Sequence, residues 1–259
     1  RNFSISNTNW LSTYINKRTK RIMAYSTISK STDYFDTKLY TGTGSSNTQT
    51  GLGFQPDWVW LKNRGSSSNH FVNDVLRGIT KELRPNLTNS EADDNQLLTS
   101  LNSDGFTLGT SGSANTNGNT YASWNWKANG AGVANTAGSI NSTVSANTTS
   151  GFSIVSYTGT GANATVGHGL GVAPSVIIVK RTNTTGDWVM YHEALGNGKN
   201  MRMNDTGAED TSSSVWNATT PTSSVFSVGT FAETNGSSDT FIAYCFAEIP
   251  GFSKFGLYE

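Results

Sequence analysis

Apolar residues along the chain follow one pattern that occurs twice. A Gly-rich segment begins with YTGTG at Tyr40 and again at Tyr157, and it leads through Gly-Leu-Gly and a proline into four consecutive apolar residues. These runs are WVWL at 58–61 and VIIV at 176–179. The offset is 117 at the tyrosines (157 − 40) and 118 at the prolines (174 − 56). A short apolar run bounded by Gly and Pro predicts a strand buried on both faces, so we expect one structural unit used twice.

Later blocks of the two copies also match. DGFTLGT at 104–110 corresponds to SVFSVGT at 224–230, and TYASWNWKA at 120–128 corresponds to TFIAYCFAE at 240–248. Alternation with period two places Trp124 and Trp126 on one face of the strand. Because that face is heavily apolar in both copies, we expect these strands to anchor the cores, where each large buried side chain contributes about 1.5–3 kcal/mol.

Residues 69–84 allow two readings. Apolar side chains four apart are typical of a helix, and they are Phe71, Val75, Ile79 and Leu83. The second copy, however, has a Gly-Asn-Gly sequence at 196–198 and an alternating segment, WVMYH, before it. Two copies of one unit share secondary structure, so we predict strand, turn, strand in both, with a short helical turn over 72–76 as the alternative.

The pattern predicts an all-β chain with two tandem antiparallel β-sandwich domains of jelly-roll or concanavalin (lectin-like) type, at residues 33–128 and 151–250. Between them, residues 129–150 are almost entirely small and polar, which indicates a linker with room for one edge strand at 139–145. Residues 251–259 repeat the Gly-Phe-Ser of 151–153, so they form either the start of a third unit or a closing strand.

Residues 1–32 differ from the rest. They carry a basic cluster at 17–21 and show no sustained hydrophobic period, and we interpret them as an N-terminal tail whose first 22 residues precede a native start at Met23. On this interpretation Trp10 and Tyr14 do not pack into the first domain.

Composition narrows the function. The chain has 18 Lys+Arg and 18 Asp+Glu residues, and only 14% of its residues are charged. It therefore lacks the excess of basic residues that is typical of nucleic-acid-binding proteins. No apolar run reaches the roughly 18 residues of a membrane span, and no signal peptide is evident. We therefore expect neither nucleic acid nor membrane as a partner. The single cysteine, Cys245, excludes an intrachain disulfide and is typical of a small buried hydrophobe.

Candidate catalytic and metal-binding residues form no recognised constellation. His70, His168 and His192 have no partner at metal-ligand spacing. Glu91, Asp93 and Asp94 offer oxygens for calcium but match no calcium-loop spacing, so a solvated loop is the better interpretation. We therefore expect no enzyme activity, no cofactor and no metal.

Seven tryptophans suggest a sugar-binding surface, because aromatic faces stack on sugar rings. The strand pattern assigns four of them to cores: Trp58, Trp60, Trp124 and Trp126. Trp188 and Trp216 lie near predicted loop ends and are the remaining carbohydrate-binding candidates, with Asp187 and His192 as polar neighbours. The blander interpretation is that both cover hydrophobic edges.

The matched blocks also resemble a known group of proteins. Segments such as GLGFQPDWVWLKNR, NSDGFTLGT, TYASWNWKA and GHGLGVAPSVIIVK are similar to the repeat domains of tail-fibre-like and other virion structural proteins of bacteriophages, especially marine ones. The resemblance covers nearly everything from Met23 onward. It implies a β-sandwich module of a virion appendage, assembled in the host cytoplasm, and it supplies no catalytic or binding residue.

Three hypotheses follow. The first is a non-enzymatic bacteriophage structural protein whose partners are other virion proteins or further copies of itself. The second is a carbohydrate-binding module that recognises a host-surface glycan. The third is a polysaccharide depolymerase, which requires two nearby carboxylates in a cleft.

Overall fold

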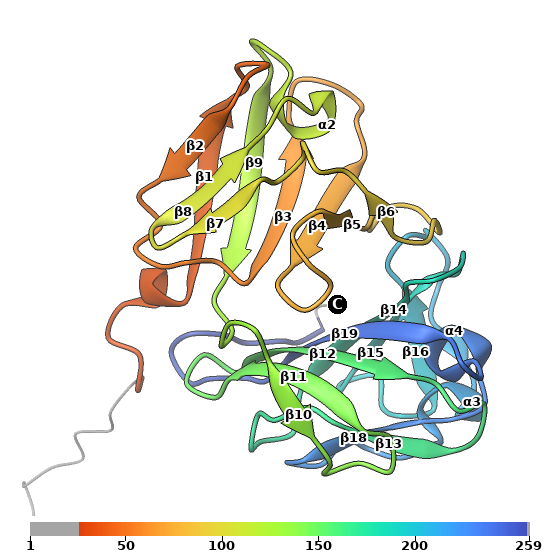
Figure 1. Ribbon diagram of the computed structural model, residues 1–259. Coiled ribbons are helices and arrows are strands. Elements are labelled where there is room, and N and C mark those ends of the chain that lie inside the picture. Colours follow the sequence, from red (N-terminus) through yellow and green to blue (C-terminus); the bar gives the residue numbers. More distant parts are fainter. Residues whose placement is uncertain (1–25, 258–259) are drawn as a thin grey trace, which may run out of the picture.

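The fold consists almost entirely of antiparallel β-sheet, as the computed structural model shows for residues 26–257 (Figure 1). The all-β prediction is therefore confirmed. Two layered halves lie one above the other in Figure 1, and we call them the first half (residues 35–126) and the second half (residues 133–246). No helix in the described part of the chain is long and apolar enough to cross a membrane.

The first half has a four-stranded and a three-stranded sheet. The four-stranded sheet has the order β1 (Phe35–Thr41), β9 (Thr120–Trp126), β3 (Trp58–Asn63), β4 (His70–Asp74). The other contains β2 (Asn47–Thr50), β8 (Gly105–Leu108) and β7 (Ser100–Asn102). The smaller elements are η1 (Ser31–Asp33), α2 (Gly112–Asn115) and the paired strands β5 (Lys81–Glu82) and β6 (Ala92–Asp93).

The second half repeats this arrangement with a larger sheet. Its eight strands are β10 (Val133–Asn135), β11 (Ser142–Asn147), β12 (Phe152–Thr158), β19 (Thr240–Phe246), β14 (Val176–Arg181), β15 (Trp188–His192), β16 (Lys199–Arg202) and β17 (Asp210–Thr211). A two-stranded sheet of β13 (Ala164–Gly167) and β18 (Val225–Val228) covers one face. Two short helices, α3 (Ser213–Trp216) and α4 (Ala232–Asn235), complete it.

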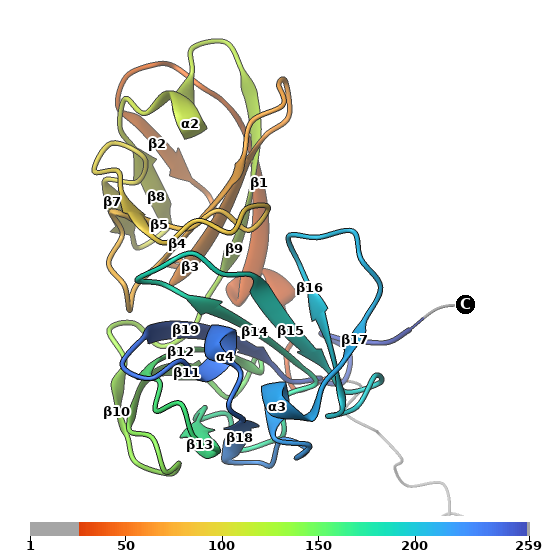
Figure 2. The same cartoon turned by 90° about the vertical axis from the view of Figure 1, so that its right-hand side faces the viewer.

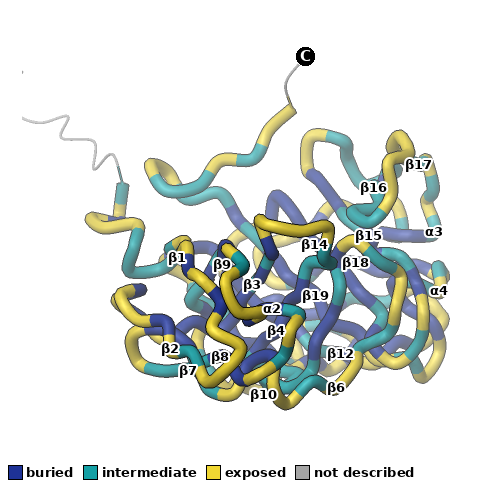
Figure 3. Tube along the Cα trace, turned by 90° about the horizontal axis from the view of Figure 1, so that it is seen from above, coloured by how far each residue is buried: buried dark blue, intermediate teal, exposed yellow. Residues whose placement is uncertain are grey.

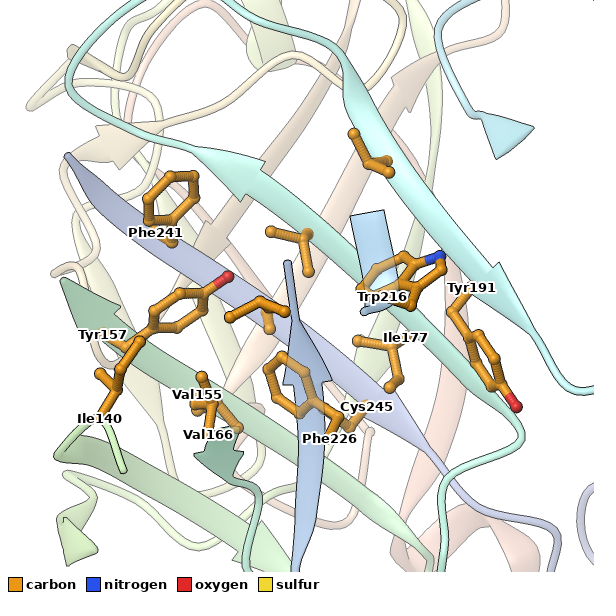
Figure 4. Packing of buried hydrophobic residues seen from close by; sticks show 14 of the residues in the cluster. Ile140, Val155, Tyr157, Val166, Ile177, Tyr191, Trp216, Phe226, Phe241 and Cys245 are labelled. Atoms are coloured by element: carbon orange, nitrogen blue, oxygen red, sulfur yellow. The ribbon is translucent and has the colours of Figure 1, made fainter. Parts of the chain in front are cut away.

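Each half encloses a core of its own, and Figure 4 shows that of the second half. The central strands β3 and β14 have equivalent environments, as the duplicated pattern predicts. Val59 and Leu61 face the first core, and Ile177 and Val179 face the second. Their other faces meet a third cluster, so these two strands are covered on both sides.

The third cluster lies between the halves. It joins Trp58 of β3 to Tyr244 of β19, whose ring centroids are 4.7 Å apart, and it includes Val72, Phe152 and Trp188. From above, the buried parts of β3 and β19 lie in the middle of the molecule (Figure 3). The expectation that the apolar faces of β9 and β19 each anchor the core of their own half is thus wrong, because both faces point into this third cluster.

The YTGTG sequence forms the same tight corner in both halves. Tyr40 donates its hydroxyl proton to the carbonyl of Ala114 (2.9 Å), and Tyr157 does the same to Thr234 (2.7 Å). A Cβ at Gly42 would lie 2.2 Å from the Thr116 carbonyl oxygen. Glycine is required there because the backbone of the next segment passes through that space.

Residues 129–150 are not a linker, which corrects the sequence interpretation. They supply β10 and β11, and β11 pairs with β12 along its whole length. Ile140 and Val144 are buried in the second core. These two apolar side chains suffice to anchor the segment in the core, because backbone hydrogen bonds to β12 order the polar residues around them.

The region at 69–84 is strand, turn, strand, as predicted. β4 ends at Asp74 and is followed by a turn and β5, and β15 and β16 are arranged in the same way. The helical alternative over 72–76 is not formed.

The predictions for the N-terminal tail and for the C-terminal segment have different outcomes. Met23, Trp10 and Tyr14 lie outside the described residues, although Ile28, within the predicted tail, is buried. Within the described residues, 250–257 form no strand beyond the isolated bridge of Ser253 to Ile249, so the closing-strand alternative is wrong for this part of the segment. This segment instead places Phe252 edge-on against Tyr34, with ring centroids 6.3 Å apart.

Candidate functional site

A groove lined by tryptophans lies on the outer face of the first four-stranded sheet. Trp60 of β3 and Trp124 of β9 are cross-strand partners, and Trp58 and Trp126 form the next pair. The second half covers Trp58 fully, with 2% of it exposed. It leaves Trp60, Trp124 and Trp126 half-buried, so these three indoles remain accessible at the edge of the contact.

The groove has a defined size and walls. Trp60, His70, Trp124 and Trp126 surround a cleft of about 250 Å³, and we call this set the tryptophan groove. A second cleft of about 270 Å³ shares Trp60 and His70 and reaches Met203, which follows β16. In Figure 2 the connection between β16 and β17 rises beside the lower end of the first half. Both volumes are near the lower end of those of small-molecule sites.

His70 is the principal polar group of the groove. Its Nδ1 accepts a hydrogen bond from Nε1–H of Trp60 (2.9 Å). Because an indole nitrogen can only donate, Nδ1 carries no proton and the ring proton lies on Nε2. Burial lowers the pKa of His70 below its ordinary value, and the nearby charge of Lys62 lowers it further.

The Nε2–H of His70 is free to bind a ligand. It has no hydrogen-bond partner among the described residues, and it is not among their fully buried unpaired atoms. The groove therefore offers an exposed donor beside aromatic faces.

The groove continues beyond Trp126. That indole also lines a cleft of about 310 Å³ together with Ser31, Phe35 and Phe252. A smaller hollow of about 110 Å³ lies between Trp126 and the C-terminal segment. The tryptophan groove is thus the central part of a longer aromatic surface.

None of the residues that line these four clefts is a carboxylate, lysine or arginine. Glycoside hydrolysis in most families uses a pair of Asp or Glu side chains that flank the scissile bond. The groove can bind a ligand by stacking and hydrogen bonding, and it lacks that pair.

Comparison with known proteins identifies the family. A family model described as "Domain of unknown function (DUF7483)" matches residues 30–259. The chain belongs to the DUF7483 family. No curated protein and no solved structure matches the chain. The matched DUF7483 segment runs through both halves and contains every residue of the groove.

The two tryptophans selected from the sequence lie elsewhere. Trp188 and Trp216 are each 1% exposed, so neither presents a face to a sugar, and the expectation that they are accessible near loop ends is wrong. Trp188 packs in the third cluster and donates Nε1–H to the Arg84 carbonyl (3.1 Å). Trp216 lies in the second core, edge-on to Tyr191.

Their proposed polar neighbours do not converge either. Asp187 forms an ion pair with Arg202 (2.6 Å) and accepts a hydrogen bond from Asn204, which holds the start of the β16–β17 connection. His192 lies at the other end of β15, where its Nδ1 accepts from the backbone N–H of Ala194 (3.1 Å). Asp187 thus holds two neighbouring side chains, and His192 serves the local backbone.

The other acidic, histidine and cysteine residues considered from the sequence are paired with neighbouring groups or buried. Asp93 pairs with Lys81 (2.6 Å), Glu91 lies 3.6 Å from Arg77, and Asp94 accepts from Ser111. The described residues hold no group of three or more metal-ligand side chains. His168 is fully buried with both ring nitrogens hydrogen-bonded, and burial raises the pKa of Cys245 to about 12.

A sequence signal for the groove existed. Where the second copy has Ile178 and Tyr244, the first has Trp60 and Trp124. In the second half these positions are buried in the third cluster. A tryptophan excess in only one of two otherwise equivalent copies indicates a role other than packing, but the uncovered edge itself depends on how the halves dock.

Proposed function

We propose that this protein is a non-catalytic glycan-binding module, and that the tryptophan groove is its binding site. The observation that carries the proposal is the side-by-side exposure of Trp60, Trp124 and Trp126 on a rigid sheet, next to the free Nε2–H of His70. Flat aromatic rings stack on the C–H faces of sugars, and a nearby donor fixes orientation.

Rigidity supports this assignment. Trp60 is held by its hydrogen bond to His70, and Trp126 packs on Trp58 with ring centroids 4.5 Å apart. Side chains already ordered in the free protein lose little entropy when a ligand binds, which favours affinity. An exposed row of ordered indoles is otherwise costly in water.

The resemblance to virion proteins supports a second candidate, in which the chain is a structural module of a bacteriophage appendage. The specific observation is the third cluster, which joins the halves into a continuous unit suited to a spacer. The two proposals are compatible if the appendage presents the groove to the host surface. Its partners would then be other virion proteins or further copies, together with a host glycan.

The test of the binding proposal is a glycan array probed with the wild-type protein and with Trp124→Ala. We expect a defined set of glycans to be retained by the wild type and lost by the variant. Trp124→Phe, which keeps an aromatic face, retains part of the binding, and Val172→Ala, an exposed change in the second half, leaves it intact.

Two outcomes contradict the binding proposal. One is that Trp124→Ala binds the same glycans equally well, and the other is that no glycan is retained by the wild type. In the second case, self-association of the pure protein, measured by light scattering, favours the structural candidate.

A further inference from the structure

We propose that the tryptophan groove is the middle of a longer binding surface, and that its ligand is a linear, uncharged oligosaccharide with one sugar in each of three adjoining clefts. This inference rests on the proposed function and names its ligand class. The first cleft reaches from Trp60 to Met203, the second is the tryptophan groove, and the third lies between Trp126 and Phe35. We call the first and third the Met203 cleft and the Phe35 cleft, and all three together the extended groove.

The three clefts form one row, because neighbouring clefts share walls. Trp60 and His70 line both the Met203 cleft and the tryptophan groove. Trp126 lines both the tryptophan groove and the Phe35 cleft. The Met203 cleft and the Phe35 cleft have no residue in common, so the tryptophan groove lies between them. A ligand that fills the row must be elongated.

Aromatic rings follow each other along this row. Trp60 and Trp124 have ring centroids 6.4 Å apart and planes at 71°, so the two rings cannot stack on the same face of one sugar. Trp126 lies two residues further along β9, about 7 Å away on the same face of the sheet. The ring of Phe35 is 4.5 Å from that of Trp126. Successive rings therefore suit successive sugars of one chain.

The sizes of the clefts agree with one sugar in each. Their volumes are about 270 Å³ for the Met203 cleft, 250 Å³ for the tryptophan groove and 310 Å³ for the Phe35 cleft. Sites for drug-sized ligands have volumes of about 300–1,000 Å³, so no single cleft suits a whole oligosaccharide.

Each cleft also has a polar group that can bind a sugar hydroxyl. His70 supplies Nε2–H to the tryptophan groove. Asn86 in the Met203 cleft is exposed and donates one Nδ2 hydrogen to Asn69, which leaves its second hydrogen for a ligand. Ser31 in the Phe35 cleft is exposed, and its hydroxyl makes no hydrogen bond within the described residues. An aromatic face with a nearby polar group thus recurs in every cleft.

The absence of charge selects an uncharged chain. None of the residues that line the three clefts is Asp, Glu, Lys or Arg. Lys62 is the cross-strand partner of His70, but its Nζ donates to the Ser68 carbonyl (2.5 Å) and it lines none of the clefts. A uronate or sulfate group would lose water without gaining an ion pair, which disfavours acidic polysaccharides.

The experiment measures binding as a function of chain length. Cello-, manno-, malto- and laminari-oligosaccharides of one to six sugars are printed on an array, with shorter fragments of every other glycan that the wild type retains. Oligomers of β-1,4-linked mannuronate are matched to the β-1,4-linked manno-oligosaccharides, because the two differ only in the carboxylate at C6. The array is probed with the wild type, Trp124→Ala, Phe35→Ala and Ser31→Ala.

We expect the wild type to bind a tetrasaccharide of its preferred series at least about tenfold more tightly than the disaccharide, with little gain for longer chains. Mannuronate oligomers should not be retained. Phe35→Ala should weaken tetrasaccharide binding by about tenfold, because it removes an aromatic wall from one end of the row. Disaccharide binding should stay within about twofold, since a disaccharide can occupy the other two clefts, and this also shows that the variant is folded.

Ser31→Ala provides a second test that does not depend on how Phe35→Ala folds. Ser31 is exposed, so its replacement leaves the packing intact. It should weaken tetrasaccharide binding by about threefold, as expected for the loss of one hydrogen bond, and leave the disaccharide unchanged.

Disaccharides that bind as tightly as hexasaccharides overturn the extended groove while the proposed function stands. So does tetrasaccharide binding that neither Phe35→Ala nor Ser31→Ala weakens. Retention of mannuronate in preference to mannose oligomers overturns the uncharged ligand class. Absence of any Trp124-dependent glycan overturns the proposed function and this inference with it, and dimerisation that Trp124→Ala abolishes then assigns the groove to a second copy of the chain.

Discussion

At the scale of single residues, burial and hydrogen bonding separate tryptophans that look alike in the sequence. Trp58 and Trp60 are two positions apart on β3, so both point to the outer face, yet Trp58 is buried and Trp60 is half-exposed. Only Trp60 has a donor–acceptor partner, His70; Nε1 of Trp58 has none in the described structure. These differences predict different responses to mutation.

Trp58→Ala should destabilise the protein by about 3–5 kcal/mol, because it opens a cavity in the third cluster. Trp124→Ala should cost much less, since its side chain is already partly in water. Urea unfolding followed by circular dichroism measures both. Equal losses for the two variants would mean that Trp124 is a packing residue.

His70 should make the groove sensitive to acid. Its lowered pKa keeps it neutral at pH 7, and protonation of Nδ1 on acidification removes the acceptor for Trp60. The unfolded chain takes up this proton first, at its ordinary value of 6.5, so the contribution to stability is present above pH 6.5 and is lost as the pH falls through the lowered pKa.

Indole fluorescence and glycan binding should therefore both change as the wild type is acidified. His70→Asn places an oxygen near the position of Nδ1 and does not titrate, so it should flatten that change. Burial also lowers the pKa of His168. Because His168 is present in both the wild type and His70→Asn, its effect on the pH dependence cancels when the two are compared. An identical pH profile in His70→Asn would exclude His70 as the cause.

At the scale of elements, the duplicated corner shows how much the sequence specifies. Asn115 and Asn235 are both fully buried. Asn115 accepts from the N–H of Thr43 and donates to the carbonyls of Ser45 and Gly109. Asn235 makes the equivalent bonds to Thr160, Ala162 and Gly229. One local sequence thus builds one local structure in each half.

Asn115→Ala and Asn235→Ala should be similarly destabilising, by about 2–4 kcal/mol each, because each removes a fully buried amide that makes at least three hydrogen bonds. Chemical denaturation measures the loss. A large difference between the two variants would indicate that the corners are not equivalent.

The strands were largely predictable, because Gly, Pro and period-two alternation act locally. The apolar run of β14, Val176–Val179, reads directly as a strand covered on both faces, and the structure agrees. In contrast, β11 was expected only as an edge strand of a linker at 139–145, because Ile140 and Val144 are sparse among polar residues; it is an inner strand of the second sheet, between β10 and β12. The groove could not be located from sequence, since exposure of Trp60 depends on contacts more than 100 residues away, such as those of Tyr244.

At the scale of the whole molecule, polar links accompany the apolar contact between the halves. Tyr244 donates to the buried carboxylate of Asp74 (2.7 Å), which also pairs with Arg77 (2.6 Å). Lys180 is fully buried and donates to the carbonyls of Thr88 (3.0 Å) and Gly186 (2.6 Å). The bonds of Tyr244 to Asp74 and of Lys180 to Thr88 thus link the two halves through buried polar groups.

Titration of Lys180 should make the unfolding free energy of the protein depend on pH in the alkaline range. Burial lowers its pKa from the ordinary 10.5 to about 8. Between these values the unfolded chain binds more protons than the folded protein, so stability rises with pH. The unfolding free energy of the wild type, relative to Lys180→Met, should increase by up to about 1.4 kcal/mol per pH unit across this window. A flat difference would mean that the buried amine titrates normally.

The central claim is that docking of the halves leaves three indoles free to bind a glycan while it buries Trp58 and Trp188. Indole N–H signals of the ¹⁵N-labelled protein, titrated with a glycan retained on the array, test this directly. The signals of Trp60, Trp124 and Trp126 should shift with saturable dependence on ligand, while those of Trp58, Trp188 and Trp216 stay in place. Shifts confined to Trp188 or Trp216, or none in the groove, would contradict the account.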